Sequence, residues 1–78
     1  MIIPDRVLTE MAEIAPYLDD CDDWMVLKKL LLRSIPSEQR RLFSTRDPVT
    51  KKQSLNDFEM NIIEEYYKLT GVRLELKL

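Results

Sequence analysis

Apolar residues near the start of the chain recur at helical spacing. Steps of four, three and four residues separate the members of this stripe, which are Val7, Met11, Ile14 and Leu18. This period places them on one face of an α-helix. Pro4 is tolerated in a first helical turn, whereas Pro16 disfavours the helical conformation at the residue before it. The pattern predicts a helix over residues 4–15.

The densest apolar run lies in the second quarter of the chain, where only Lys28 and Lys29 interrupt it. A helix this apolar around its circumference is typical of the centre of a fold. Just before it stand four aspartates, Asp19, Asp20, Asp22 and Asp23. Their position favours N-capping and suits the helix dipole. Because Pro36 stops the pattern, we expect a central helix over residues 22–35 and a short third helix over residues 37–44.

A fourth helix has the clearest boundary signals. Its apolar stripe steps by three, four, four and three residues and consists of Leu55, Phe58, Ile62, Tyr66 and Leu69. Ser54 and Asp57 match a capping box at its start. Gly71, the only glycine in the chain, suits the left-handed conformation that ends many helices. These signals predict a helix over residues 54–70.

The last seven residues alternate apolar and charged positions without a break. A period of two indicates a half-buried strand over residues 72–78. An isolated strand leaves its backbone unpaired, so it needs a partner, either the short apolar piece at residues 1–3 or another chain. The expected fold is therefore all-α or nearly so: a compact domain of three to four helices with a short C-terminal β-strand.

Size and composition limit what stabilises such a fold. A chain of 78 residues forms one domain at most, and a domain this small buries only about 60% of the surface of its unfolded chain. Cys21 is the only cysteine and histidine is absent, which excludes an intrachain disulfide and disfavours a zinc site. No apolar stretch approaches the ~20 residues of a membrane span, and the N-terminus lacks secretory signal features. We expect a cytoplasmic protein.

The residues that enzymes commonly use are largely missing. Without histidine there is no Ser-His triad and no imidazole base for Cys21, whose aspartate neighbours disfavour its thiolate. A single glycine is too few for phosphate-binding loops. The acidic cluster at residues 19–23 lacks the alternating ligands and the glycine of a calcium loop. We predict no catalytic residue, cofactor or metal site, and infer that the chain is not an enzyme.

Charge is distributed unevenly along the chain. Residues 1–23 carry seven acids and one base (−6), residues 24–53 eight bases and two acids (+6), and residues 54–78 five acids and three bases (−2), which sum to the net −2. The basic segment supplies six candidates for phosphate contacts, Arg33, Arg40, Arg41, Arg46, Lys51 and Lys52. Nucleic-acid binding is the alternative function that they support, although the acidic net charge opposes it. Solvation, or pairing with the acidic first segment, is the competing interpretation.

Apolar surface exceeds what one small core covers. Residues 24–27 are consecutive and apolar, and the tyrosines at 66 and 67 lie on two sides of the fourth helix. This surplus favours a protein partner or a homodimer, and the alternative is that the first helix and the terminal strand cover it. The leading hypothesis is a non-catalytic protein-binding module that acts as a regulator, adaptor or inhibitor of a larger protein. The candidate contact residues are Trp24, Tyr66, Tyr67, Leu74, Leu76 and Leu78. The three leucines would act through an open strand edge that extends a partner's sheet.

Overall fold

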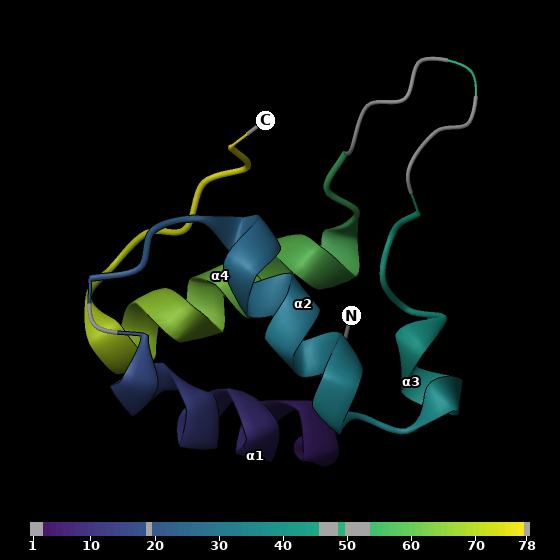
Figure 1. Ribbon diagram of the computed structural model, residues 1–78, viewed down its shortest axis with the longest axis horizontal. Helices are drawn as coiled ribbons and strands as arrows, with labels where there is room; N and C mark the ends of the chain where they lie inside the picture. Colours follow the sequence, from purple (N-terminus) through teal and green to yellow (C-terminus); the bar gives the residue numbers. More distant parts are fainter. Residues whose placement is uncertain (1–2, 19, 46–48, 50–53, 78) are drawn as a thin grey trace.

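Helices form all the regular secondary structure within residues 3–18, 20–45, 49 and 54–77, the part of the chain that the computed structural model describes (Figure 1). The elements are α1 (Asp5–Ile14), a short 3₁₀ helix (Ala15–Tyr17), α2 (Trp24–Ser34), α3 (Ser37–Arg40) and α4 (Asp57–Thr70). The radius of gyration is 12.0 Å, close to the roughly 11–12 Å of a compact domain of this length. The compact all-α fold is confirmed.

Prolines set both ends of α1. The Pro4 carbonyl oxygen accepts hydrogen bonds from the N–H groups of Val7 at 3.0 Å and Leu8 at 3.2 Å. At the other end the chain tightens into the 3₁₀ helix at Ala15, because the ring of Pro16 removes an N–H donor. The helix expected over residues 4–15 is therefore confirmed to within one residue at each end.

An aspartate of the acidic cluster caps α2. Asp23 has an extended backbone, and its Oδ1 accepts the N–H of Met25 at 3.0 Å. The helix ends at Ser34, two residues before Pro36. The central helix expected over residues 22–35 is present, shortened by two residues at its start because the cap precedes the first helical residue.

The helix expected over residues 37–44 is much shorter, since α3 ends at Arg40. The chain then turns and places Phe43 in the core. The Phe43 ring packs between two others, with its centroid 6.2 Å from Trp24 in a stacked arrangement and 5.2 Å from Phe58 edge to face. Burial of this aromatic side chain is favoured over about one further turn of a weakly apolar helix.

The capping box of α4 involves different residues from those expected. Asn56 Oδ1 accepts the Glu59 N–H at 2.8 Å, and Glu59 Oε1 accepts the Asn56 N–H at 3.1 Å, so the assignment to Ser54 and Asp57 is wrong. Asn56 Nδ2 also donates to the carbonyl oxygen of Leu42 at 2.9 Å. This contact ties the cap to the preceding connection and favours a helix that begins at residue 57 rather than 54.

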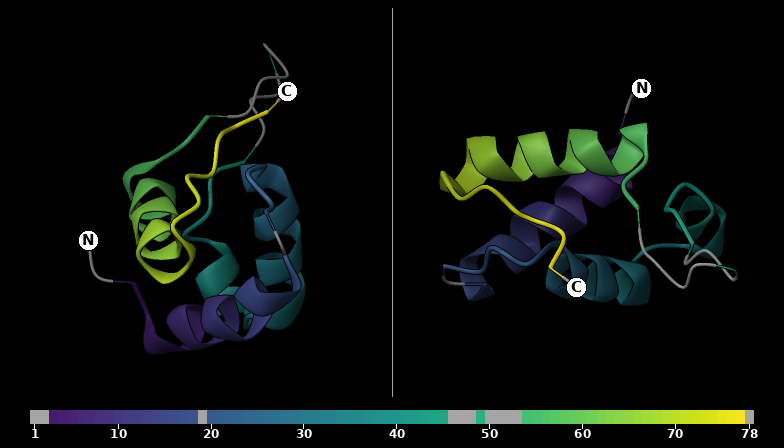
Figure 2. Two further views of the ribbon diagram at one scale, coloured as in Figure 1. Left: turned by 90° about the vertical axis from the view of Figure 1, so that its left-hand side faces the viewer. Right: turned by 90° about the horizontal axis from the view of Figure 1, so that it is seen from above.

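Gly71 ends α4 as predicted. Its φ is +76°, and its N–H donates to the Tyr67 carbonyl oxygen at 2.7 Å. A residue with a Cβ pays a steric penalty in this conformation, whereas glycine does not. The turn sends residues 72–77 back across α2 and α4 (Figure 2).

The β-strand expected over residues 72–78 is not formed within residues 72–77. One isolated parallel bridge joins Asp23 and Glu75 instead. The Glu75 N–H donates to the Asp22 carbonyl oxygen at 2.7 Å, and the Glu75 carbonyl oxygen accepts the Trp24 N–H at 2.8 Å. Pairing stops there because the partner segment becomes helical at Trp24. The backbone of Glu75 therefore pairs with residues 22–24 of the same chain, a partner that the sequence pattern did not indicate. Leu78 lies outside the described residues.

The core lies between the three longer helices. Figure 2 shows α2 and α4 beside one another, with α1 across one side of them and the C-terminal segment across the other. The buried apolar side chains are Ile3, Val7, Met11, Trp24, Leu27, Leu31, Ile35, Phe43, Phe58, Ile62, Ile63, Tyr66 and Leu74. None of the helices in the described residues is long and apolar enough to cross a membrane.

Candidate protein-binding surfaces

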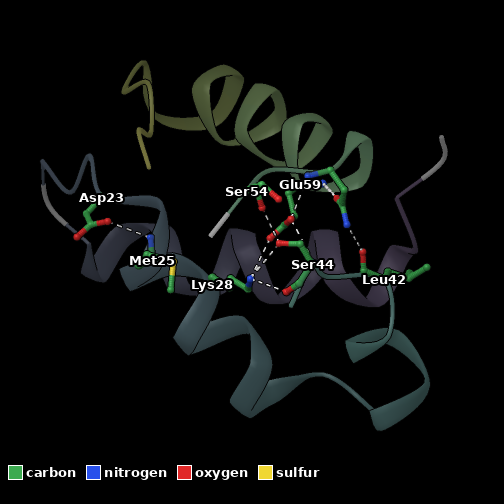
Figure 3. A network of polar contacts seen from close by, with 8 residues as sticks. Asp23, Met25, Lys28, Leu42, Ser44, Ser54 and Glu59 are labelled. Carbon is green, nitrogen blue, oxygen red and sulfur yellow. Dashed lines mark hydrogen bonds and ion pairs between the residues drawn. The ribbon is translucent and has the colours of Figure 1, made fainter. Parts of the chain in front are cut away.

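A buried ion pair links the two central helices. Lys28 of α2 and Glu59 of α4 are both buried, and Lys28 Nζ lies 3.2 Å from Glu59 Oε2. Lys28 also donates to the Ser44 carbonyl oxygen at 2.8 Å (Figure 3). Glu59 Oε1 accepts the N–H groups of Ser44 at 3.2 Å and Asn56 at 3.1 Å. The pair therefore joins α2, the segment after α3 and the start of α4.

This network stabilises the fold rather than offering a reactive group. Its contacts join groups within the protein, and its side chains are shielded from solvent. The sequence pattern predicted Glu59 to lie on a solvated face and Lys28 only to interrupt an apolar run, whereas both side chains are buried. Lys28 lies on the buried stripe of α2, together with Leu27 and Leu31. A charged residue in such a stripe indicates a buried partner of opposite charge.

Most of the predicted partner-binding residues belong to the core. Trp24 and Tyr66 are each 1% exposed, and Leu74 is also buried. Leu76 is half-buried and packs against the same cluster. These side chains lack the free surface that an interface anchor needs in this structure. The backbone N–H and carbonyl groups of Glu75 already bond to Asp22 and Trp24, so they are not open for addition to a partner's sheet.

Tyr67 is the exception, because 44% of it is exposed. The guanidinium carbon of Arg73 lies 4.7 Å from the Tyr67 ring centroid, and Arg73 Nη1 donates to Glu64 Oε1 at 2.7 Å. This hydrogen bond holds the pKa of Glu64 below its ordinary value and raises the pKa of Arg73. The aromatic ring, the base and the acid form one ordered surface unit.

An apolar hollow of about 200 Å³ lies beside this unit, lined by Leu55, Met60, Ile63, Glu64, Arg73 and Leu74. Met60 is 54% exposed and stands seven residues before Tyr67, on the same face of α4. We refer to Met60, Ile63, Glu64, Tyr67 and Arg73 as the α4 face. It combines a hollow, a flexible methionine and a fixed tyrosine–arginine pair.

A second hollow, of about 300 Å³, lies between α1 and α2. We call it the α1–α2 groove, and its lining residues are Glu10, Glu13, Ile14, Tyr17, Leu30, Arg33 and Ser34. Tyr17 is 87% exposed, the same fraction as Val49 and above the other large apolar side chains described as exposed. Tyr17 was not among the predicted contact residues, although its position directly after Pro16 and off the apolar stripe of α1 is a usable signal.

The basic candidates divide into two groups. Arg33, Arg40 and Arg41 are exposed, and none forms an ion pair with another described residue. Arg46, Lys51 and Lys52 lie outside the described residues. In the part of the chain that the structure covers, the surface ion pairs lie elsewhere, for example between Asp22 and Lys77 at 2.7 Å, where the hydrogen bond lowers the pKa of Asp22 and raises that of Lys77. None of these three arginines pairs with an acid of the first segment that the structure describes.

Within the described residues, no group of three or more His, Cys, Asp or Glu side chains is placed to hold a metal ion. Half-buried Cys21 makes a weak contact from Sγ to the Asp23 carbonyl oxygen at 3.8 Å. Comparison with known proteins adds no assignment: no family model matches the chain, and no significant match was found among curated proteins or solved structures. Any functional inference must come from the surfaces themselves.

Proposed function

We propose that this chain is a non-catalytic protein-binding module that acts as a regulator, adaptor or inhibitor of a larger protein, and that it docks through the α4 face. The observation that carries the proposal is the Tyr67–Arg73 pair beside the apolar hollow. Tyrosine and arginine are over-represented among the residues that dominate binding energy at interfaces. Here the two are already in contact and ordered.

Preorganisation favours binding by this face. Arg73 lies over the Tyr67 ring and is held by Glu64, so ordering these long side chains costs less entropy when a partner arrives. Only Nη1 of Arg73 donates a hydrogen bond to another described residue. Its other N–H groups can therefore donate to an oxygen of a partner. Met60 adds an unbranched side chain that adapts to different apolar shapes.

These features define the segment that fits. A hollow of about 200 Å³ accommodates one apolar side chain rather than a larger surface. Its apolar walls, Leu55, Met60 and Leu74, match an aliphatic or aromatic residue. A carbonyl or carboxylate oxygen next to that residue would accept from Arg73. The proposed occupant is a segment of a larger protein that presents an apolar anchor next to such an acceptor.

The test compares two alanine variants in the full chain. Tyr67→Ala removes the centre of the α4 face, whereas Leu69→Ala removes a side chain of similar exposure that points about 160° away around the same helix. Tagged wild type and both variants are used to capture proteins from nuclease-treated native extract, and the retained proteins are quantified by mass spectrometry. We expect a protein retained equally by wild type and Leu69→Ala, and at least about tenfold less by Tyr67→Ala. Equal retention by both variants overturns the proposal.

A second candidate function rests on the exposed arginines. Arg33, Arg40 and Arg41 have no ion-pair partner among the described residues, which leaves them available for phosphates. This proposal is an accessory protein that binds nucleic acid. Its affinity for a duplex should fall steeply with salt and fall further in Arg40→Glu with Arg41→Glu. An affinity that does not change with salt contradicts it.

A further inference from the structure

The α1–α2 groove has an apolar floor and one large exposed aromatic side chain. Ile14 and Leu30 line it from the two helices, and Tyr17 stands at its edge with 87% of its surface exposed. Val26, which is 40% exposed, lies one turn before Leu30 and extends the apolar strip along α2. A tyrosine this exposed contributes little to the core, yet it carries the ring and hydroxyl that interfaces favour.

The two sides of the groove carry opposite charges. On the α1 side stand Glu10 and Glu13, and on the α2 side stands Arg33. Glu10 is already paired with Arg6 at 3.0 Å. Glu13 and Arg33, in contrast, have no ion pair within the described residues. One acid and one base that pair with no other described residue therefore face solvent across an apolar strip.

This layout is complementary to itself. A twofold axis that runs along the groove, in the plane of contact, places the acidic side of each copy opposite the basic side of the other. Glu13 of one copy then faces Arg33 of the second copy, twice, while the apolar strips meet between them. We propose that the α1–α2 groove is the contact surface of a symmetric homodimer, with Tyr17 as its anchor.

The proposed contact uses a different part of the molecule from the α4 face, so a dimer would leave both α4 faces open. The proposed dimer contact also requires only a small fraction of the accessible surface of each chain. A specific interface removes roughly 800 Å² from each partner, about 15% of the 5348 Å² that one chain exposes. Tyr17, Val26 and Arg33 can be changed without touching the core, since their side chains are exposed.

The experiment is sedimentation equilibrium of the full chain from about 1 μM to about 1 mM, a range that covers weak and moderate dimers. Wild type should form dimers, and Tyr17→Ser should weaken association at least about 30-fold. Tyr67→Ser is the matched control and should leave the dimer constant unchanged. Circular dichroism checks that each variant folds. A monomeric wild type at 1 mM, or equal association by Tyr17→Ser, overturns the homodimer and leaves the α4 proposal standing.

A charge exchange tests the twofold arrangement itself. Glu13→Arg and Arg33→Glu should each weaken the dimer about threefold to tenfold, because each places like charges at both symmetric contacts. An equimolar mixture of the two variants should recover association, since a dimer with one of each has opposite charges at both contacts. Failure of the mixture to exceed either variant alone rules out the pairing of Glu13 with Arg33.

Discussion

The α4 face and the α1–α2 groove both place a tyrosine beside an apolar hollow, but they differ in how the charges around it are satisfied. Around Tyr67, Arg73 covers the ring and pairs with Glu64 at 2.7 Å. Around Tyr17, the ring stands in solvent and the charges of Glu13 and Arg33 have no ion-pair partner within the described residues. The charges of the first surface are paired within one chain. Those of the second, Glu13 and Arg33, are not paired with any other described residue.

This difference fits the two kinds of recognition that we propose. A surface whose charges are already paired discriminates mainly by shape, by its apolar hollow and by the remaining donors of Arg73. A surface with unpaired opposite charges on its two sides is directional, because only one orientation of the partner matches them. Fixed tyrosine–arginine geometry therefore suits a heterologous protein segment, while the α1–α2 groove suits its own copy.

Both surfaces exist only in the folded chain, and substitution in the buried Lys28–Glu59 pair is expected to lower the free energy of unfolding most. Lys28→Ala leaves Glu59 buried without its counter-ion, which typically costs about 3–5 kcal/mol, most of the stability of a domain this small. Urea unfolding followed by circular dichroism should show the cooperative transition greatly weakened or absent. Both faces should then lose binding together.

The matched control is Lys29→Ala, which removes an exposed lysine from the next position of α2. It should change the free energy of unfolding by no more than about 0.5 kcal/mol. Replacing the pair together, with Lys28→Met and Glu59→Leu, should recover part of the loss because no charge is left buried alone. A Lys28→Ala effect as small as that of Lys29→Ala would contradict the structural role of the pair.

The fold was more predictable than the surfaces, because helices leave periodic signals whereas long-range contacts do not. The stripe of α4 and its end at Gly71 could be identified from local sequence. Asn56 and Glu59 also stand three residues apart, so local sequence allows two boxes, and the contact of Asn56 with Leu42, fourteen residues away along the chain, favours the observed one. Helix caps chosen by tertiary contacts lie beyond a local pattern.

The C-terminal segment shows the same limit. Its alternation placed Leu74 on a buried face, and Leu74 is buried. A strand needs a long partner as well as an alternating sequence, and the segment beside Glu75 enters α2 one residue after the bridge. For the candidate site, sequence identified Tyr67 but not Tyr17, because exposure depends on which neighbours the fold supplies.

Gly71→Ala tests whether the turn that positions Arg73 over Tyr67 needs glycine. No atom beyond the two neighbouring residues lies within 4 Å of the added Cβ, so the cost comes from the φ of +76°. We expect a loss of about 1–2 kcal/mol in urea unfolding, and a smaller loss for Gly71→Asn, since asparagine tolerates this conformation better. An alanine variant as stable as wild type would show that the turn can adopt another conformation.

The stability of the monomer should separate the two tyrosines. At concentrations below dimer formation, Tyr17→Ala should change the free energy of unfolding by less than about 0.5 kcal/mol, because its side chain is almost fully exposed. Tyr67→Ala should cost more, since it removes the ring that Arg73 covers. Thermal and urea unfolding of both variants at a few micromolar provides the comparison. Equal effects would mean that Arg73 does not order the α4 face in solution.

The smallest expected effect is the pH dependence of the Glu64–Arg73 pair, because exposed pairs are screened by solvent. The pKa of Glu64 is lowered in the folded chain from its ordinary value of 4.5, chiefly by the hydrogen bond from Arg73. The contribution of the pair to stability is therefore complete above that ordinary value and is lost as pH falls through the lowered pKa. Carbon-detected NMR titration of the Glu64 carboxyl group should place its pKa below 4.5.

Arg73→Gln should return the Glu64 pKa toward its ordinary value, because the charged donor is gone. Lys77→Gln is the matched control, since it removes the base that lowers the pKa of Asp22 and leaves Glu64 unchanged. If Glu64 titrates identically in wild type and Arg73→Gln, the pair does not persist in solution. Arg73 would then not be held over the Tyr67 ring. The difference in charge pairing between the α4 face and the α1–α2 groove would no longer explain their proposed roles.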